Sequence, residues 1–402
     1  MNSATDQFDY ITRTVDVTLP EGALLAQLER SIETGVPLRA KLGVDPTAPD
    51  VTLGWAVVFD LLRRFQETGH TAVLILGDFT AQVGDPSGKS ATRKRLSDEE
   101  VNEHVDSCLP TIRSLLLDER LEVRRNSEWL GAMDMADVLE MTAGVTVSRI
   151  MDRDDFATRW KASEPISMIE LMYPLLQATD SVAVRADVEI GGNDQLLNLL
   201  MGRDLQERAG QRPQSVATVP LLVGTDGAKK MSQSLGNYIS VRDDAAEMFG
   251  KTMSIPDELM PQWFRLAAGA TIDEVAAIES GLGDHSLHPG ETKRRLASSI
   301  VERYHGAGAG STAEAAFDQV FRSHDIPDDV PVAKLGEDEP VWLPKALSEA
   351  GLVASNSEGR RMIAQGAVKV DGEKVSRDTM ERSKLLDSVV QVGKRRFVRF
   401  VE

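Results

Sequence analysis

Three polar side chains fall at helical spacing in the middle of the chain. Tyr173, Gln177 and Asp180 are separated by four and three residues, which places them on one face of a helix. A phenol, an amide and a carboxylate that share a face can form a polar recognition surface. The alternative is structural: Tyr173 packs in the core, and the other two side chains are solvated.

A glycine-rich turn follows this helix along the chain. Its sequence is Gly191-Gly192-Asn193-Asp194-Gln195. Paired glycines let the backbone approach a ligand closely, and Asp194 is placed to accept hydrogen bonds from hydroxyl groups. We therefore interpret this turn as a second part of a binding site.

Two further segments have the composition of phosphate-binding loops. Residues 41–55, KLGVDPTAPDVTLGW, run from a strand end through a turn to a helix N-terminus, where phosphate groups bind favourably. Residues 229–234, KKMSQS, form a basic loop with hydroxyl groups between glycines, which suits holding phosphates during a displacement. Each segment also has an ordinary interpretation, as a structural turn and as a solvated lysine pair.

The spacing of apolar residues predicts the elements that hold these segments. A short strand over Leu38–Val44 precedes a helix over Leu53–Glu67, which Gly69 ends. A buried strand follows over Ala72–Leu76. Strand, helix and strand in this order form a βαβ unit, so we predict a doubly wound α/β domain. Another apolar strand, Val216–Val223, fits the same sheet.

In the rest of the chain, residues 245–320 are predicted to be helical. Residues 324–340, rich in proline and acidic side chains, read as a linker. Two helices, a strand and a hairpin turn at Asp371-Gly372 are predicted after it.

Composition narrows the class of protein. A chain of 402 residues is long enough for two or three domains, and 42% hydrophobic with 27% charged residues is typical of a globular protein. No apolar run approaches the roughly 18–20 residues that cross a bilayer, and the N-terminus does not read as a secretory signal. Cys108 is the single cysteine, which excludes an internal disulfide and a cysteine-based zinc site. We expect a cytoplasmic protein with no membrane partner.

Charge is distributed unevenly along the chain. The net charge is -18, yet residues 341–402 contain 12 Lys and Arg against 8 Asp and Glu. An acidic body with a basic tail is compatible with an RNA that touches part of the surface. A solvated surface of mixed charge is the alternative.

Taken together, the segments resemble bacterial tyrosyl-tRNA synthetases of class I. The shared wording is GxDPTAPDxxLG, GDPSGKS (Gly84–Ser90), YPLLQxxDSVxxxADVExGGxDQxxN and KMSxSLGNYI, in this order, and the likeness runs from about Pro37 to the C-terminus. The resemblance implies a Rossmann-like doubly wound parallel sheet in a catalytic domain, a helical anticodon-binding domain and a small α+β RNA-binding domain. It places these over 1–240, 241–325 and 341–402, with a linker at 326–340.

The resemblance also implies an activity: tyrosine is activated with ATP to tyrosyl-adenylate and then transferred to tRNA. ATP would bring Mg²⁺, with no tightly bound cofactor and no metal site in the protein, and the chain would form a homodimer. The implied tyrosine-binding residues are Lys41, Gly43, Asp45, Asp85, Tyr173, Gln177, Asp180 and Gln195. Tyr173, Gln177 and Asp85 would hold the ammonium group, and Asp180 would meet the phenol. The implied ATP-binding residues are Thr47, Gly54, Gly192, Asp194, Lys230 and Ser232.

Both signature motifs depart from the family. The HIGH signature reads Thr52-Leu53-Gly54-Trp55, and in the KMSKS signature Gln233 replaces the second lysine. The implied catalytic residues are thus Thr52, Trp55, Lys230 and Gln233. One charge-stabilising donor contributes about 2.7–4 kcal/mol, so we expect a slowed enzyme. The alternatives are a repurposed paralogue that binds or activates tyrosine or an analogue, in specialised metabolism or inhibitor resistance, and a non-catalytic RNA-binding protein.

Overall fold

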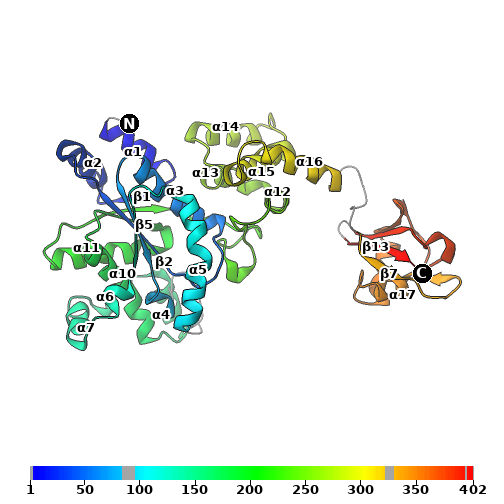
Figure 1. The fold of residues 1–402 in the computed structure, drawn as a ribbon, viewed down its shortest axis with the longest axis horizontal. Coiled ribbons are helices and arrows are strands. Elements are labelled where there is room, and N and C mark those ends of the chain that lie inside the picture. Colours follow the sequence, from blue (N-terminus) through cyan, green and yellow to red (C-terminus); the bar gives the residue numbers. More distant parts are fainter. Residues whose placement is uncertain (1–2, 84–95, 322–329, 394–395, 402) are drawn as a thin grey trace. The chain divides into compact units, whose positions relative to one another are not determined.

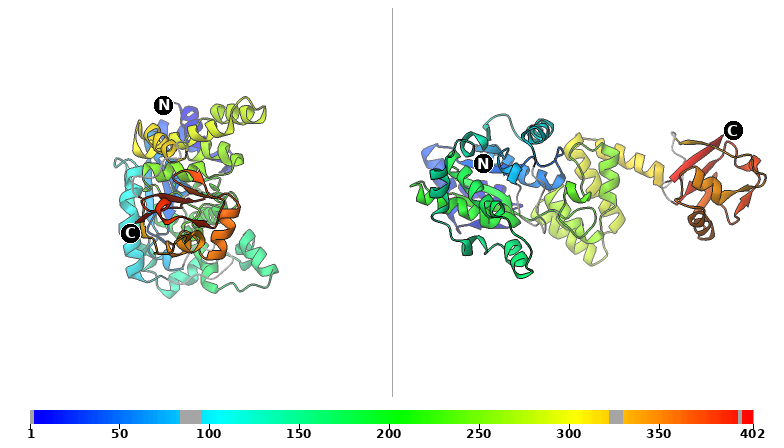
Figure 2. Two further views of the ribbon diagram at one scale, coloured as in Figure 1. Left: turned by 90° about the vertical axis from the view of Figure 1, so that its right-hand side faces the viewer. Right: turned by 90° about the horizontal axis from the view of Figure 1, so that it is seen from below.

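The computed structural model describes residues 3–83, 96–321, 330–393 and 396–401. They divide into two compact units, Met1–Gly310 and Ser311–Glu402 (Figures 1 and 2). The domain boundaries predicted after residues 240, 325 and 340 stay predictions. Among the described residues, no helix is both long and apolar enough to cross a membrane.

A six-stranded sheet forms the centre of the first unit. Its strand order is β1-β6-β5-β2-β3-β4, and every neighbouring pair is parallel except β1 with β6. The strands are β1 (Val17–Leu19), β2 (Arg39–Val44), β3 (Thr71–Leu76), β4 (Leu121–Arg125), β5 (Val188–Gly192) and β6 (Ser215–Val219).

The strand order reverses between β2 and β5. From β2 the chain adds β3 and β4 on one side, whereas β5 and β6 extend the sheet on the other side. In a doubly wound sheet, ligands bind outside the carboxyl ends of the strands at such a reversal. The predicted doubly wound α/β fold is confirmed, and it points to the ends of β2 and β5 as the site.

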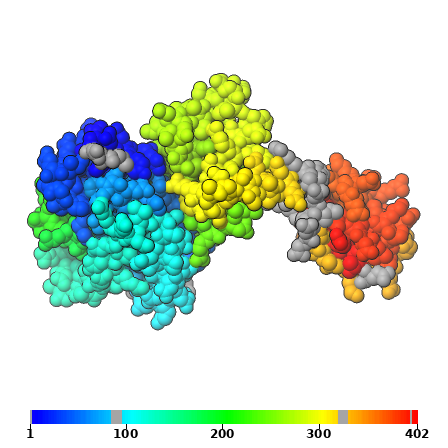
Figure 3. All heavy atoms as spheres, turned by 45° about the horizontal axis from the view of Figure 1, so that its top comes forward, coloured from blue at the N-terminus to red at the C-terminus, as the bar shows by residue number. Residues whose placement is uncertain are grey.

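Helices cover both sides of this sheet. α3 packs against β2, β3 and β5, and α11 packs against β5 and β6; α5 and α11 lie on opposite sides of the sheet in Figure 1. On the face drawn in Figure 3, α5 (cyan) forms part of the surface. The helices up to residue 208 are α1 (Ala4–Thr12), α2 (Ala23–Thr34), α3 (Leu53–Glu67), α4 (Thr80–Val83), α5 (Asp98–Leu115), α6 (Ser127–Leu130), α7 (Met135–Thr142), α8 (Val147–Ile150), α9 (Asp154–Lys161), α10 (Met168–Val184) and α11 (Leu196–Arg208).

The βαβ unit predicted at the start of the sheet is confirmed. α3 has the predicted bounds because Thr52 caps its first turn and Gly69, at φ 96°, ends it in a conformation that glycine adopts without strain. The strand predicted over 216–223 is too long. β6 ends at Val219 because Pro220, which has no backbone N–H, follows it.

The segment predicted to be helical over 245–320 forms separate helices. Short turns divide it into α12 (Ala245–Met253), α13 (Met260–Leu266), α14 (Ile272–Gly283), α15 (Pro289–His305) and α16 (Ala309–Phe321). α15 packs against α12 and α13, and Trp263 is fully buried.

The second unit contains a five-stranded sheet of order β10-β9-β12-β13-β7, with a separate β8–β11 pair. Its elements are β7 (Val332–Lys334), β8 (Val341–Trp342), α17 (Leu343–Glu349), α18 (Asn356–Ala364), β9 (Val368–Val370), β10 (Glu373–Lys374), β11 (Thr379–Met380), β12 (Val389–Val392) and β13 (Arg396–Val401). The predicted helices and hairpin are confirmed, with Asp371 and Gly372 at φ 47° and 86°. β7 is a correction, because it lies inside the predicted linker 326–340. β7 pairs with β13, which is the last strand of the unit in sequence, so the residues around β7 carry no local pattern that predicts a strand.

Candidate active site

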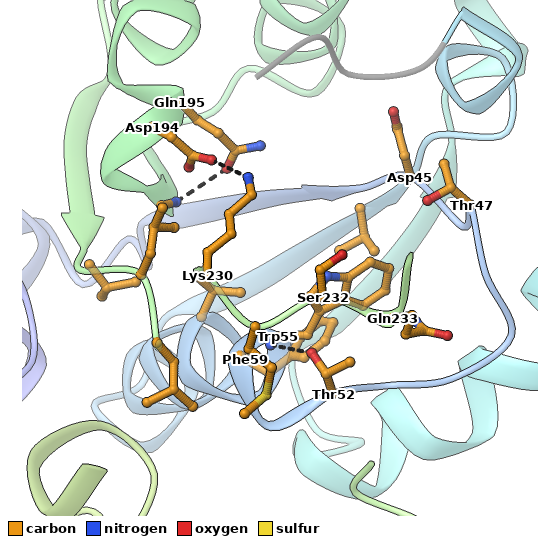
Figure 4. A pocket seen from close by; sticks show the side chains of 18 of the residues that line it. Asp45, Thr47, Thr52, Trp55, Phe59, Asp194, Gln195, Lys230, Ser232 and Gln233 are labelled. Atoms are coloured by element: carbon orange, nitrogen blue, oxygen red, sulfur yellow. Dashed lines mark hydrogen bonds and ion pairs between the residues drawn. The ribbon is translucent and has the colours of Figure 1, made fainter. Parts of the chain in front are cut away.

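A pocket of about 540 Å³ opens at the carboxyl ends of β2 and β5. It lies where the strand order reverses, as the topology predicts. Many predicted site residues line it: Gly43, Asp45, Thr47, Thr52, Gly54, Trp55, Tyr173, Gly192, Asp194, Gln195, Lys230, Ser232 and Gln233. The side chains labelled in Figure 4 come from the β2–α3 loop and the start of α3, the turn after β5 and the loop around Lys230. Tyr173 lines the pocket from α10.

The N-terminus of α3 forms one wall of the pocket. The Thr52 hydroxyl oxygen accepts a hydrogen bond from Trp55 N at 3.3 Å and so caps the helix. The Thr52 side chain is buried, and it keeps its hydroxyl proton as a donor. Because Leu53 N and Trp55 N are already hydrogen-bonded, the dipole of the helix N-terminus is the feature that favours an anion here. This wall therefore suits phosphate even though both histidines of the signature are absent.

The opposite wall carries an ion pair across the pocket. Lys230 Nζ lies 2.7 Å from Asp194 Oδ2, and Figure 4 shows the lysine reaching toward the turn after β5. The Gln195 amide oxygen accepts from Gly192 N at 3.2 Å. A Cβ on Gly192 would lie 2.7 Å from Asp194 Oδ1 and 2.9 Å from Leu221 Cδ2, so a larger residue there would displace both side chains. A cation and a hydroxyl-accepting carboxylate are thus placed within reach of one bound ligand.

A chain of hydrogen bonds leads from the pocket to α10. The Tyr173 hydroxyl donates to Asp45 Oδ2 at 2.9 Å, and the Thr80 hydroxyl donates to Asp45 Oδ1 at 2.8 Å. Asn126 Nδ2 then donates to Thr80 Oγ1 at 2.9 Å and lies 3.4 Å from Asp180 Oδ2. The carboxylates at the two ends of this chain, Asp45 and Asp180, therefore have fixed orientations.

Asp180 is a buried carboxylate behind the pocket. Its Oδ1 accepts from Trp129 Nε1 at 2.8 Å. Burial raises the pKa of Asp180 to about 6, against the opposing effects of the Lys41 charge and of the hydrogen bonds from Trp129 and Asn126. The group can still ionise near neutral pH and accept a hydrogen bond from a hydroxyl.

Lys41 lies beneath the pocket and is fully buried. Its ammonium group donates to Glu189 Oε1 at 2.8 Å, Ser181 Oγ at 2.9 Å and the Gln177 backbone oxygen at 3.0 Å. An ammonium group has three donors, and all three are used. The resemblance implies that Lys41 binds tyrosine, yet Lys41 does not line the pocket. Its ammonium group instead holds the residues behind the lining in place.

The Gln177 side chain is held by the same network. Its Nε2 donates to Glu189 Oε1 at 3.0 Å, and its Oε1 accepts from Asn198 Nδ2 at 3.0 Å. The structural alternative for this helix face, with Gln177 and Asp180 solvated, is wrong because both are buried. Like Lys41, these two side chains lie behind the lining of the pocket. Asp85 and the rest of 84–90 fall outside the described residues.

The sequence reasoning missed several residues of this network. Asn126 and Trp129 follow the end of β4, and Glu189 and Asn198 lie in and after β5. A glutamate inside an otherwise apolar strand was the available signal, because a buried charge needs a partner.

The loop around Lys230 is anchored at several points. Met231 N donates to Leu222 O at 2.8 Å, and Ser232 N donates to the Asn237 side-chain oxygen at 2.9 Å. The Gln233 side chain forms two hydrogen bonds with the backbone of Asp50. Within the described ranges, no group of three or more His, Cys, Asp or Glu side chains is placed to hold a metal ion.

Comparisons with known proteins identify the family of this fold and site. The sequence model of the tRNA synthetases class I (W and Y) matches residues 33–322, and that of the S4 domain matches residues 341–377. The chain is 49% identical over 393 residues to the tyrosine–tRNA ligase of Moorella thermoacetica, covering 98% of this chain and 95% of that protein. It is 48% identical over 398 residues to the tyrosine–tRNA ligase of Geobacter sulfurreducens, covering 99% of both.

A solved structure has the same fold. The tyrosyl-tRNA synthetase of Archaeoglobus fulgidus, crystallised with L-tyrosine, matches with a TM-score of 0.63 at 25% identity. The match covers 77% of this chain and 99% of that one. The sequence model spans most of the chain and includes every segment that lines the pocket. The chain therefore belongs to the class I tRNA synthetases of the tryptophan and tyrosine group.

Proposed function

We propose that this protein is a tyrosine–tRNA ligase that works in two steps. In the first step, a carboxylate oxygen of tyrosine attacks the α-phosphorus of ATP, and the bond to the leaving pyrophosphate breaks. In the second step, a ribose hydroxyl of the tRNA terminus attacks the activated carbonyl, and AMP leaves. The observation that carries the proposal is the pocket at the ends of β2 and β5, with a cation, a helix N-terminus and a carboxylate around it.

The proposed ATP site uses both walls of the pocket. The phosphates lie at the N-terminus of α3, near Thr47 and Gly54, and carry Mg²⁺ in with them. Lys230 exchanges Asp194 for the phosphate oxygens, and Asp194 with Gly192 receives the ribose. Because no covalent protein intermediate is needed, the rate depends on positioning and on charge stabilisation as pyrophosphate leaves.

The proposed tyrosine site lies deeper, toward α10. Tyr173 and Asp45 line it with Gln195, and the buried Asp180 accepts the phenol hydroxyl. A site built to hydrogen-bond a substrate hydroxyl rejects the analogue that lacks it by about 10⁴–10⁵-fold; tyrosyl-tRNA synthetase is the known example of that rule. We propose that Asp180 provides the discrimination against phenylalanine here.

In this proposal, the two altered signature motifs lower the rate of tyrosine activation but leave the reaction itself unchanged. Thr52 and Trp55 still offer hydrogen-bond donors, and Lys230 keeps its charge. The two relatives described above are tyrosine–tRNA ligases that match almost the whole chain, which favours this function over a repurposed paralogue or a non-catalytic RNA-binding protein.

The second unit is the proposed contact with tRNA. It contains the S4 match, and residues 341–402 are basic overall in an otherwise acidic protein. Basic side chains bind the phosphate backbone, so this contact should weaken as salt rises. We also propose that the protein is located in the cytoplasm.

We also propose a homodimer that buries an apolar surface on α7 to α10. Large apolar side chains are exposed in this stretch, among them Trp160 at 72% and Met168 at 74%. Exposed apolar side chains that gather in one region are typical of protein interfaces. Light scattering should give a dimer for the unmodified protein and a monomer for Trp160→Glu/Met168→Glu. Ile272→Glu, at a position on α14 that is 65% exposed, is the control that should leave the dimer intact.

Tyrosine-dependent ATP–pyrophosphate exchange tests the first step. We expect exchange by the unmodified protein, and a fall of roughly 100–1,000-fold for Lys230→Ala, since one charge-stabilising donor is lost. Lys229→Ala, the exposed neighbour, is the matched control. Charging of tRNA then tests the second step. If the unmodified protein binds tyrosine but shows no exchange, and Thr52→His/Trp55→His restores it, the repurposed paralogue is the correct function.

A further inference from the structure

Gln233, the residue that replaces the second lysine of the signature, forms a two-point contact with a neighbouring loop. Its Nε2 donates to the Asp50 backbone oxygen at 2.7 Å, and its Oε1 accepts from Asp50 N at 3.2 Å. In Figure 4 its amide points toward the β2–α3 loop, away from Lys230. We call these paired hydrogen bonds between Gln233 and Asp50 the amide clamp.

The amide clamp joins the tip of one loop to the wall of the pocket. Among the described residues, the other hydrogen bonds of 232–236 stay within the same loop: Leu235 N to Ser232 O, Gly236 N to Gln233 O, Ser232 N to Asn237 Oδ1, and Ser232 Oγ with Ser234 Oγ. The tip thus reaches the β2–α3 loop by hydrogen bonds through Gln233.

The receiving side of the clamp is itself fixed. The Asp50 carboxylate accepts from the Tyr238 hydroxyl at 3.2 Å and lies 3.4 Å from Arg242 Nη2. Val241 N donates to Val51 O at 2.8 Å, and Leu53 N donates to Ile239 O at 2.9 Å. The clamp therefore attaches the tip to a segment that is itself hydrogen-bonded and that continues into the N-terminal cap of α3.

An amide is the side chain that can make both bonds. It has a donor and an acceptor on one planar group, which matches the N–H and C=O of a single backbone residue. A lysine at position 233 has donors only and cannot accept from Asp50 N. A glutamate has acceptors only and would face the Asp50 carbonyl oxygen without a donor.

We propose that Gln233 is a positioning residue: the amide clamp holds the 230–234 segment closed over the nucleotide, so that Lys230 and Ser232 face the phosphates. This inference rests on the proposed function, because it takes the pocket to be the ATP site. It assigns the position a role in holding the loop, in place of the charge that the family's second lysine would bring.

Hydrogen–deuterium exchange on the full chain without substrates tests the clamp directly. In Gln233→Met, which has similar volume and no hydrogen bonds to offer, we expect the Asp50 amide and those of 232–236 to exchange about tenfold faster, the effect of losing two neutral hydrogen bonds. Gln233→Lys should show the same loss of protection, because charge does not restore the acceptor. Leu235→Ala, an exposed position on the same turn, is the control that should leave the Asp50 amide protected.

Kinetic measurements distinguish a positioning role of Gln233 from an effect on the stability of the whole protein. In pyrophosphate exchange, Gln233→Met should lower kcat about tenfold and leave the KM for tyrosine within about twofold, with an unchanged melting temperature. The proposal is overturned if the Asp50 amide keeps its protection in Gln233→Met, or if protection is lost while kcat is unchanged. If the unmodified protein shows no pyrophosphate exchange, the proposed function fails, and the exchange of the Asp50 amide still decides whether the clamp exists.

Discussion

Lys41 and Glu189 form an ion pair of 2.8 Å between Nζ and Oε1, and neither side chain has any exposure to solvent. The pair joins adjacent strands, because Lys41 lies opposite Glu189 in the register of β2 and β5. Glu189 also accepts from Gln177 Nε2 and Ser181 Oγ. A buried charge pair with every polar atom hydrogen-bonded fixes the geometry around it, and this one lies beneath the proposed tyrosine site.

Breaking this pair should destabilise the first unit strongly. Lys41→Met leaves the Glu189 carboxylate buried without its cation, and we expect a loss of about 3–5 kcal/mol in the free energy of unfolding. Urea unfolding followed by tryptophan fluorescence measures it. Lys41→Met/Glu189→Gln removes both charges and should recover more than half of the loss. An equal loss in the single and double variants would contradict the ion-pair argument.

Asp180 should make the protein less stable as pH rises from about 4 to about 6. Burial raises the folded-state pKa to about 6 from a usual value of 3.8, so the folded state holds the proton more tightly than the unfolded state in this range. The stability of the unmodified protein relative to Asp180→Asn should fall by on the order of 3 kcal/mol between pH 4 and pH 7. Urea unfolding at several pH values checks this, and a constant difference would refute it.

His70 should have the opposite effect. Its Nδ1 accepts from Leu38 N at 3.2 Å, which requires a neutral ring, and burial lowers its pKa to about 4, with the charge of Arg120 adding to the shift. Because the unfolded state binds the proton more tightly, stability is lost as pH falls from about 6.5 to about 4. Relative to His70→Gln, the unmodified protein should lose on the order of 3 kcal/mol over that range. The same unfolding series, with the sign reversed from Asp180, is the measurement.

Asp60 should be needed to hold α15 against α3. Its carboxylate pairs with Arg64 of α3 and with Arg303 of α15. Although burial opposes it, the charge of Arg303 and then that of Arg64 hold the pKa of Asp60 below its usual value. Asp60→Asn leaves the buried Arg64 with less compensation, so we expect a loss of about 3 kcal/mol in urea unfolding. Asp118→Asn, at a side chain 88% exposed, should change stability by less than about 0.5 kcal/mol.

The parts of the fold that follow local patterns could be predicted from the sequence. The bounds of α3 follow from apolar spacing, a threonine cap and a glycine end, and the hairpin at Asp371-Gly372 follows from turn chemistry. The face shared by Tyr173, Gln177 and Asp180 follows from helical periodicity in the same way.

Contacts between distant segments could not be predicted in this way. β7 gains strand structure from β13, and Lys41 gains its partner from a strand almost 150 residues further along the chain. The clamp between Gln233 and Asp50 has the same character. A single sequence shows that a glutamine has replaced a lysine, and only the folded arrangement shows which backbone group the glutamine meets.

The parallel pairing of β7 with β13 places the first and the last strand of the second unit side by side. A domain whose first and last strands are neighbours is the kind of domain that tolerates insertion into another protein or circular permutation. The last strand, β13, is an internal strand of the sheet and lies between β12 and β7. Removal of β13 would leave β12 and β7 without a shared neighbour, so a shortened tail should unfold the whole module and spare none of it.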